Sequence, residues 1–366
     1  MYVKGLQFQN FRNLSDDCIK PCEGINVIYG NNAQGKTNIL EALWLFCGGH
    51  SFRASRENEL VKYGEKFYKL KVKFFSQDRE QDAEIIFNGG KREVVINGVK
   101  KASSTALIGR YTAVIFSPED MTLVKRGPSA RRRFIDSAIC REKFQNAVLL
   151  AKYNQTLNQR NALLKDIFRH PELKKTLDIW DDTLCDLGAA IILQRLSYIE
   201  KLSKKAREYH FGISDNTEEL SLSYISTCAA ENGDSKSEIF EKLKKSLHES
   251  KSEDFRSGYT NVGPHRDDFD IIINDRKAKI FASQGQQRSA VLSLKLAEAQ
   301  VLSELTGENP VILLDDVLSE LDRKRQDFLL NKINGYQVFI TCCDFEVNNL
   351  LGEGKKFLIQ NGEVKQ

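Results

Sequence analysis

Strand-like patterns of apolar and polar residues dominate the first 120 residues of the chain. Residues 2–9 alternate between the two kinds, which is typical of a half-buried strand. The pairs Asn88-Gly89 and Asn97-Gly98 separate later runs and indicate antiparallel hairpins. Residues 38–46 have the apolar spacing of a helix instead. The strands predicted for this region are 2–9, 24–30, 67–75, 83–87, 92–96 and 111–116.

The pattern changes near Gly127-Pro128, and from there to about residue 210 it is almost entirely helical. Ile192, Leu196 and Ile199 recur at steps of three and four, and charged residues fill the opposite face. This predicts two long helices that are interrupted around His170-Pro171. A strand at 219–227 and a helix at 236–249 follow.

Strands and helices alternate again toward the C-terminus. The predicted elements are a strand at 269–273, a helix at 286–305, a strand at 310–316, a short helix, and strands at 337–341 and 356–360. We therefore expect one α/β domain built from both chain ends, with a mainly helical arm inserted between them. The expected division is 1–125, 126–257 and 258–366.

Composition bounds the protein only loosely. With 41% apolar and 28% charged residues, the 366-residue chain is typical of a globular protein. Its net charge of +4 neither requires nor excludes nucleic acid, so a local basic patch would have to carry such binding. Eight cysteines without CxxC pairs favour a reduced, cytoplasmic compartment. No apolar run predicts a membrane span or a signal peptide.

The stretch "GNNAQGKT" matches the phosphate-binding pattern GxxxxGK[ST] at every fixed position and has a strand before it and a helix after it. Backbone N–H groups and the helix N-terminus present positive potential to phosphates. Lys36 is expected to reach the β- and γ-phosphates, and Thr37 to coordinate Mg²⁺. The predicted ATP-binding residues of this loop are Gly30, Asn31, Asn32, Ala33, Gln34, Gly35, Lys36 and Thr37.

"VILLDD" at 311–316 is the expected partner of this loop, because it is an apolar strand that ends in carboxylates. Open α/β sheets bind ligands at the carboxyl ends of their strands. Asp315 would hold Mg²⁺ together with Thr37, and Asp316 would orient or polarise the attacking water.

A second anion site is predicted at "SQGQQRS", immediately before the apolar helix that follows. Ser283 is placed as a helix N-cap, and Gly285 lets the backbone approach a ligand closely. The N-terminus of the helix would present positive potential there, which is useful if it meets the γ-phosphate held by another molecule.

These three motifs together resemble an ABC-type ATPase of the SMC-like branch, in which "SQGQQRS" is the signature motif. Further stretches resemble the RecF family of bacterial DNA replication and repair proteins: "FQNFRNL", "SFRASRENELV", "FSPEDMTLVKRGPSARRRFID" and "YTNVGPHRDDF". The resemblance implies an ABC-type P-loop ATPase head with an inserted helical arm. It also implies an ATP-dependent homodimer in which each ATP contacts one copy's P-loop and the other copy's signature turn.

The family resemblance further implies DNA binding at single-strand gaps and double-strand/single-strand junctions. RecR and RecO are the implied partners in loading RecA, in support of repair, DNA replication and the SOS response.

Residue roles carry over from the resemblance at several positions. Ser283, Gly285 and Gln286 would contact the partner copy's nucleotide, and Arg12 would contact phosphate. Asp322 matches the D-loop, and Glu119 lies near the usual Q-loop glutamine.

Two departures from the ABC pattern predict weak ATPase activity. Asp316 is one methylene shorter than the usual glutamate, and Cys342-Cys343 occupies the place of a common switch histidine. With Lys36 and Ser283 as the other catalytic residues, we expect slow hydrolysis that acts as a timer.

The run Arg131-Arg132-Arg133 opens a helix, where cations oppose the helix dipole. Either an external anion such as DNA phosphate or a buried carboxylate would explain these residues. A structural or interface role is favoured over a metal site for His265-Arg266-Asp267-Asp268, because one histidine with two adjacent carboxylates is weak evidence for a metal.

Two other functions compete with a DNA-repair ATPase. The nucleotide-binding subunit of an ABC transporter would share the signature turn, but the polar-faced helical insertion opposes it. A P-loop kinase of a small molecule would have no use for that turn. Substituting Ser283 with Arg separates the kinase, because a kinase would keep its activity, whereas co-purification with membranes would favour the transporter subunit.

Overall fold

The computed structural model describes residues 1–48, 51–54, 56–167, 169–343 and 354–365. These residues form two compact units, one from Met1–Thr122 with Arg288–Gln366 and one from Leu123–Gln287. The first division falls close to the expected position. The second lies in helix α8 (Gln284–Thr306), well beyond the expected 257/258.

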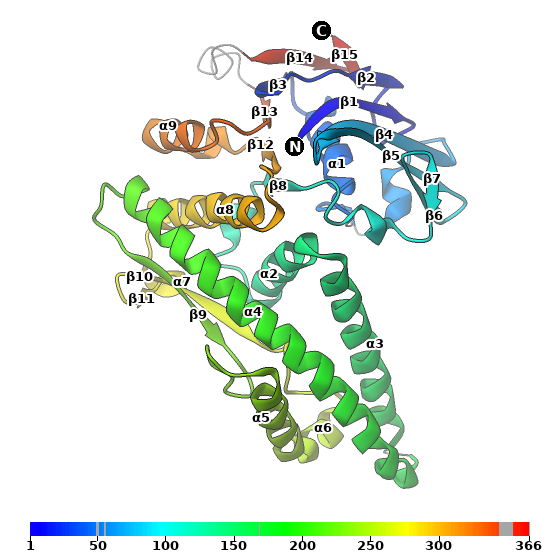
Figure 1. Ribbon diagram of the computed structural model, residues 1–366, viewed down its shortest axis with the longest axis vertical. Helices are drawn as coiled ribbons and strands as arrows, with labels where there is room; N and C mark the ends of the chain where they lie inside the picture. The colour runs from blue at the N-terminus through cyan, green and yellow to red at the C-terminus, as the bar shows by residue number, and fades with distance from the viewer. Residues whose placement is uncertain (49–50, 55, 168, 344–353, 366) are drawn as a thin grey trace. The chain divides into compact units, whose positions relative to one another are not determined.

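The first unit contains two six-stranded sheets (Figure 1). One is antiparallel with strand order β2-β1-β4-β5-β6-β7. Its strands are β1 (Tyr2–Gln9), β2 (Asp17–Ile19), β4 (Phe67–Ser76), β5 (Arg79–Asn88), β6 (Lys91–Ile96) and β7 (Val99–Lys101). Alternating burial along β4 follows the alternating sequence, and Asn97 and Gly98 both have positive φ in the predicted hairpin turn.

The other sheet has strand order β15-β14-β3-β13-β12-β8 and is parallel except for β15. Its strands are β3 (Ile25–Tyr29), β8 (Ala113–Phe116), β12 (Val311–Asp315), β13 (Val338–Cys342), β14 (Lys355–Gln360) and β15 (Glu363–Lys365). β12 and β13 are buried throughout, as their continuous apolar sequences predict.

One apolar core joins the two sheets of the first unit, and helix α1 (Lys36–Leu45) contributes Ile39, Leu40 and Leu43 to it. Residues at both ends of the chain enter this core, for example Leu6 and Phe357. The first unit also contains α9 (Arg323–Lys332) and short 3₁₀ turns at Glu57–Leu60, Ser104–Leu107, Asp120–Thr122 and Leu318–Glu320. Because the parallel strands are covered on both faces, their carboxyl edge is the part of this sheet that is free to carry a site.

The second unit is mainly helical. Its elements are α2 (Pro128–Glu142), α3 (Phe144–Ile167), a 3₁₀ turn (Pro171–Thr176), α4 (Leu177–Ile213), β9 (Leu220–Ile225), α5 (Lys236–Glu249), α6 (Lys251–Ser257), β10 (Asp268–Ile273), β11 (Arg276–Lys277) and α7 (Ala278–Phe281). α4 packs against α3 on one side and α5 on the other (Figure 1). β9, β10 and β11 form a three-stranded antiparallel sheet.

Two expectations for this region are corrected. The predicted pair of long helices is preceded by a separate helix, α2, because Lys143 is extended (φ −146°) and interrupts the helical run. The expected boundary at 257/258 does not divide the compact units, since β10 pairs along its length with β9 and so lies with the helical unit.

Buried ion pairs stabilise the second unit from within. The fully buried Arg160 of α3 donates to Asp181 of α4 at 2.7 Å and to Asp254 of α6 at 2.8 Å. Arg195 donates through two nitrogens to Asp136 at 2.8 Å each. Such groups are stable in a low-dielectric interior only as hydrogen-bonded sets.

Candidate nucleotide site and signature turn

The loop Gly30–Thr37 joins β3 to α1 and contains glycine at two positions where a side chain could not fit. Gly30 has φ 145° and Gly35 has φ 111°. A Cβ at Gly30 would lie 2.3 Å from the carbonyl oxygen of Ile359, and one at Gly35 would lie 2.7 Å from Cδ2 of Leu14. Among the described residues no side chain caps α1, so no such cap occupies the position where an anion would bind the helix N-terminus. The loop therefore fits a phosphate group.

The buried ammonium of Lys36 lies inside this loop. Its Nζ donates to the carbonyl oxygens of Gly30 at 2.6 Å and Asn31 at 2.9 Å, and to Sγ of Cys343 at 3.3 Å. The Cys343 thiol in turn donates to Oδ1 of Asn32 at 2.7 Å. The end of β13 thus touches the phosphate loop through the cysteine that replaces a switch histidine.

Thr37 and Asp315 meet as the sequence predicted. The Thr37 hydroxyl donates to Oδ1 of Asp315 at 2.7 Å, and the buried Thr341 hydroxyl donates to the same oxygen at 2.9 Å. Strand register explains the contact of Thr341, because Asp315 on β12 is the partner of Thr341 on β13. A hydroxyl and a carboxylate at this distance are the oxygen ligands that Mg²⁺ prefers.

Asp316 follows the strand in a left-handed conformation, with φ 53°. Its N–H donates to the Thr341 hydroxyl at 2.9 Å. Burial raises the pKa of the Asp316 carboxyl, and the neighbouring Asp315 charge raises that pKa further. Thr341 was missed by the sequence reasoning, since one threonine after an apolar run carries no motif.

Arg12 is held by protein groups in this structure. Its guanidinium donates through two nitrogens to the buried Glu41 at 2.8 Å each, and to the carbonyl oxygen of Glu59 at 2.9 Å. The hydrogen bonds to Glu41 raise the pKa of Arg12. Glu41 lies on α1, so Arg12 braces the helix that follows the loop; its predicted contact with phosphate stays a prediction.

The signature turn forms the predicted cap at the start of α8. The Ser283 hydroxyl accepts from Gln286 N–H at 3.2 Å, and the Gln286 side-chain oxygen accepts from Ser283 N–H at 2.8 Å. This reciprocal pair is a capping box. The turn therefore satisfies two of its own donors, the N–H groups of Ser283 and Gln286, with its own side chains.

A hydrogen-bonded chain extends from the signature turn into the helical unit. Gln286 Nε2 donates to Oε1 of Glu218 at 2.7 Å, and Oε2 of Glu218 lies 3.0 Å from Nε2 of the buried His210 on α4. Glu218 was not predicted, because nothing near it in the sequence marks its distant contact.

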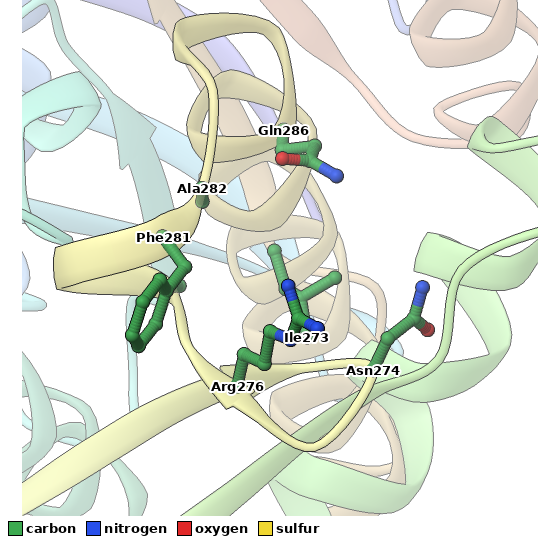
Figure 2. A pocket seen from close by; sticks show the side chains of 7 residues that line it. Ile273, Asn274, Arg276, Phe281, Ala282 and Gln286 are labelled. Atoms are coloured by element: carbon green, nitrogen blue, oxygen red, sulfur yellow. The ribbon is translucent and has the colours of Figure 1, made fainter.

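A pocket of about 350 Å³ lies beside the signature turn (Figure 2). Figure 2 shows Asn274 and Arg276 from the β10–β11 hairpin on one side of it and Gln286 from α8 on another. Phe281 and Ala282, from the segment that precedes the turn, also line the pocket, as do Ile273 and Ala278.

The D-loop residue Asp322 caps α9 by accepting from the Arg325 N–H at 3.0 Å. That hydrogen bond lowers the pKa of Asp322. The preceding Glu320 accepts from Arg288 at 3.0 Å. Glu119 is exposed, and its proposed Q-loop role remains a prediction.

Arg131 contacts a protein carboxylate, as one of the two predicted alternatives proposed, although the carboxylate of Asp268 is only partly buried. Its guanidinium is buried and donates to both oxygens of Asp268, at 2.7 and 2.6 Å. Arg131 is therefore removed from the candidate DNA contacts. Arg132 is half-buried and donates to the Asp267 carbonyl oxygen at 2.8 Å, whereas Arg133 is exposed.

His265 and Asp267 are committed to protein partners, in line with the favoured structural interpretation. His265 Nδ1 lies 2.7 Å from the Tyr153 hydroxyl, and burial lowers the pKa of His265 to about 4. Asp267 accepts from Tyr224 at 2.6 Å and from Thr227 at 2.7 Å. No group of three or more His, Cys, Asp and Glu among the described residues could hold a metal ion.

Comparison with known proteins extends over the whole chain. The RecF/RecN/SMC N-terminal domain family model matches residues 2–359. The DNA replication and repair protein RecF of Acetivibrio thermocellus is 39% identical over 367 residues and covers 100% of both chains. RecF of Caldanaerobacter subterraneus subsp. tengcongensis is 42% identical over 343 residues, covering 93% of this chain and 94% of its own.

Solved structures agree with the sequence relatives. The recombination mediator protein RecF-ATP in the RecFOR pathway superposes with a TM-score of 0.93 at 40% identity, covering 100% of this chain and 97% of that one. The Smc head domain of Pyrococcus furiosus gives a TM-score of 0.58 at 16% identity, which supports the fold alone.

A phosphate loop, an aspartate-ended strand of the same parallel sheet and a capped signature turn on this fold define an ABC-type ATPase head of the SMC-like branch. Within that class, the full-length matches at about 40% identity are more specific than the fold. The chain belongs to the RecF family. None of the helices in the described part of the chain combines the length and apolarity that a membrane span requires.

Proposed function

We propose that the chain is an ATP-dependent DNA-binding protein of recombinational repair, in which ATP drives two copies together. Each ATP is held by the phosphate loop of one copy and the Ser283 turn of the other. RecF relatives that cover the full chain, including a RecF-ATP structure, support ATP as the ligand. They favour neither a transporter subunit nor a small-molecule kinase.

The observation that carries the proposal is the capped signature turn. A helix N-terminus has value for an anion only if its donors can be released, and the Ser283–Gln286 pair holds them with two side-chain hydrogen bonds. A capping box is worth about 1 kcal/mol, whereas hydrogen bonds to a charged phosphate are worth roughly 1.5–3 kcal/mol each. An incoming γ-phosphate can therefore displace the cap.

The chain's residues divide the work at the first site. Lys36 would move from its carbonyl partners to the phosphates, and the Thr37–Asp315 pair would hold Mg²⁺. Asp316 would orient water. Because it is shorter than glutamate and Cys343 replaces a histidine, hydrolysis should be slower than the median enzyme turnover of about 10 s⁻¹. Hydrolysis then times the release of the dimer.

DNA at gaps and junctions, RecR and RecO are the proposed partners, on the strength of the RecF relatives and the RecFOR pathway named for one of them. Exposed Arg133 and half-buried Arg132 remain candidates for contact with DNA phosphates. Such contacts hold the backbone without reading base sequence.

The decisive experiment measures molecular mass by light scattering with and without ATP and Mg²⁺. Wild type should shift from monomer toward dimer, whereas Ser283→Arg should bind ATP but stay monomeric because the arginine fills the turn. Ser235→Arg is the matched control, since Ser235 forms a capping box with Glu238 at the start of α5. A Ser283→Arg protein that dimerises with ATP as wild type does would refute the shared site.

A further inference from the structure

Positive charge is concentrated in one part of the helical unit. Residues 125–175 contain 13 Lys and Arg against 4 Asp and Glu, a net charge of +9. The whole chain has 54 against 50, so the remaining residues carry 41 against 46, a net charge of −5. The overall balance near neutrality therefore hides a strongly basic segment that spans α2, α3 and the following 3₁₀ turn.

Some cations of this segment are buried and others are exposed to solvent. Arg131 and Arg160 are buried and form ion pairs with the carboxylates described above, and Arg141 is buried as well. By contrast, Lys152 and Lys165 on α3 are exposed. Neither forms an ion pair with any residue that the structure describes; Lys165 instead lies over the ring of Tyr259, at 4.5 Å from its centroid.

The exposed face of α3 is a continuous stripe that is almost free of acidic residues. The buried residues of this helix, including Tyr153, Leu157 and Leu164, lie on the opposite side. Asp166 is the acid on the stripe. The six residues that characterise the stripe are Lys152, Asn154, Gln155, Asn158, Gln159 and Lys165.

The composition of this stripe is unfavourable for a face that is merely solvated. Asparagine is a poor helix former, and glutamate paired with lysine at four residues' spacing would stabilise the helix instead. Elsewhere in this unit, exposed lysines are neutralised by ion pairs between α5 and α4: Lys236 pairs with Asp186 at 2.6 Å and Lys244 with Asp182 at 2.8 Å. The lysines between α4 and α5 therefore form ion pairs, whereas Lys152 and Lys165 on α3 form none with the residues that the structure describes.

We propose that the α3 stripe, Lys152 to Lys165, is a docking surface for the phosphate backbone of nucleic acid. Lysine, asparagine and glutamine are side chains that contact phosphate and sugar without reading sequence. At 1.5 Å per residue the stripe is about 20 Å long, which matches roughly six base pairs of duplex. This inference rests on the proposed function, and it moves the principal DNA contact from the arginine run to α3.

The test measures binding of a fluorescein-labelled duplex with a single-strand gap, by anisotropy, in the presence of ATP and Mg²⁺ at several salt concentrations. Lys152→Glu/Lys165→Glu should bind at least about tenfold more weakly. The slope of log affinity against log salt should fall by about two, because each lost phosphate contact contributes about 0.9. Lys236→Glu/Lys244→Glu has the same change in charge at the ion-paired lysines of α5 and should retain nearly all affinity.

A second variant tests the amides without removing a cation. Gln155→Glu/Gln159→Glu is nearly isosteric and adds two negative charges to the centre of the stripe. It should also weaken binding several-fold, whereas Lys236→Gln/Lys244→Gln, with the same change in net charge, should not. Melting temperature and ATP-driven mass should equal those of wild type in all four variants, because every substituted residue is exposed.

The outcomes separate the two proposals. If wild type binds the gapped duplex and both α3 variants bind it equally well with an unchanged salt slope, the stripe is not the DNA surface and faces another partner. An equal loss in the control variants would also overturn the inference, since it would reflect net charge alone. If wild type itself binds no DNA with ATP, the proposed function fails first.

Discussion

The phosphate loop and the signature turn are both starts of helices, yet they are built in opposite ways. The loop before α1 has no side-chain cap and relies on glycines and on a lysine folded against its carbonyl groups. The turn before α8 caps itself through Ser283 and Gln286, and Gln286 is also tied to Glu218. One start is left open for a ligand, and the other is closed until something displaces its own side chains.

This difference teaches which of the two can act first. An uncapped helix start with a buried ammonium is preorganised for phosphate, so its affinity does not depend on a second copy. A self-capped start has to exchange internal hydrogen bonds for new ones, so its net gain is small. The order of events should therefore be nucleotide first and partner second.

The largest effect is expected from Asp316→Asn. Loss of a positioned base lowers turnover roughly 10²- to 10⁴-fold, while ATP-driven dimerisation should persist because Ser283 is untouched. In wild type, hydrolysis should decline as the pH falls, since burial raises the pKa of Asp316 and its carboxyl therefore takes up a proton at a higher pH than an ordinary aspartate. Phosphate release from ATP across pH measures both effects. An Asp316→Asn protein with wild-type turnover would place the base elsewhere.

Lys36→Met should weaken ATP binding at the phosphate loop and, as a consequence, abolish the contact between that ATP and the partner copy's signature turn. Loss of charge-assisted hydrogen bonds worth roughly 1.5–3 kcal/mol should weaken ATP binding about ten- to hundredfold in calorimetry. The dimer should be lost as well, since the signature turn then has no phosphate to receive. Lys204→Met is the control, because Lys204 is exposed and pairs only with Glu200 among the partners the structure shows. Dimerisation by Lys36→Met at low ATP would contradict the proposed order.

Glu218→Gln should act on the second site in the opposite direction. It removes a carboxylate from beside an anion site and loosens the hold on Gln286. At the dielectric of bulk water, removing a unit charge about 4 Å away favours an incoming phosphate by about 1 kcal/mol, so ATP-driven dimerisation should strengthen about fivefold. ATP affinity of the monomer should not change. Weaker dimerisation would show instead that Glu218 supports Gln286 in the active arrangement.

The smallest effect should appear at Cys343, the exposed cysteine among the described residues. Burial raises the pKa of Cys140 and Cys185 to about 12, so these thiols should react slowly with maleimide. Cys343 should react first, and Mg-ATP should slow its labelling several-fold because Sγ lies 3.3 Å from Lys36 Nζ. Peptide mapping by mass spectrometry identifies the site. Labelling that ATP does not alter would separate Cys343 from the nucleotide.

Local patterns predicted the head well. The phosphate loop and its flanking strand and helix are specified within a dozen neighbouring residues, so no distant information was needed. The buried strands β12 and β13 could be recognised from continuous apolar runs. The contact between Thr37 and Asp315 is consistent with the expectation that both hold Mg²⁺, since the loop after β3 and the end of β12 lie at the carboxyl edge of one parallel sheet.

What could not be predicted depends on residues far apart in the chain. The α2–α3 break at Lys143 lacks a Gly or Pro signal. Arg131 contacts Asp268 only in the folded unit, so the sequence could not show that this arginine is committed to a protein partner. Likewise, β9 pairs with β10 only in the folded unit, which places the expected boundary at 257/258 inside that unit. Glu218, 68 residues from Gln286, carries no local mark of its contact with the signature turn.

Arg160 connects three helices of the arm, α3, α4 and α6, through buried ion pairs. Its side chain links α3 to Asp181 and Asp254 with no exposed surface, so losing any one member strands a charge in the interior at a cost of about 3–5 kcal/mol. Substitutions at these positions can therefore be tolerated only in concert. A single substitution inside this cluster should therefore unfold the arm more readily than a single substitution on its exposed faces.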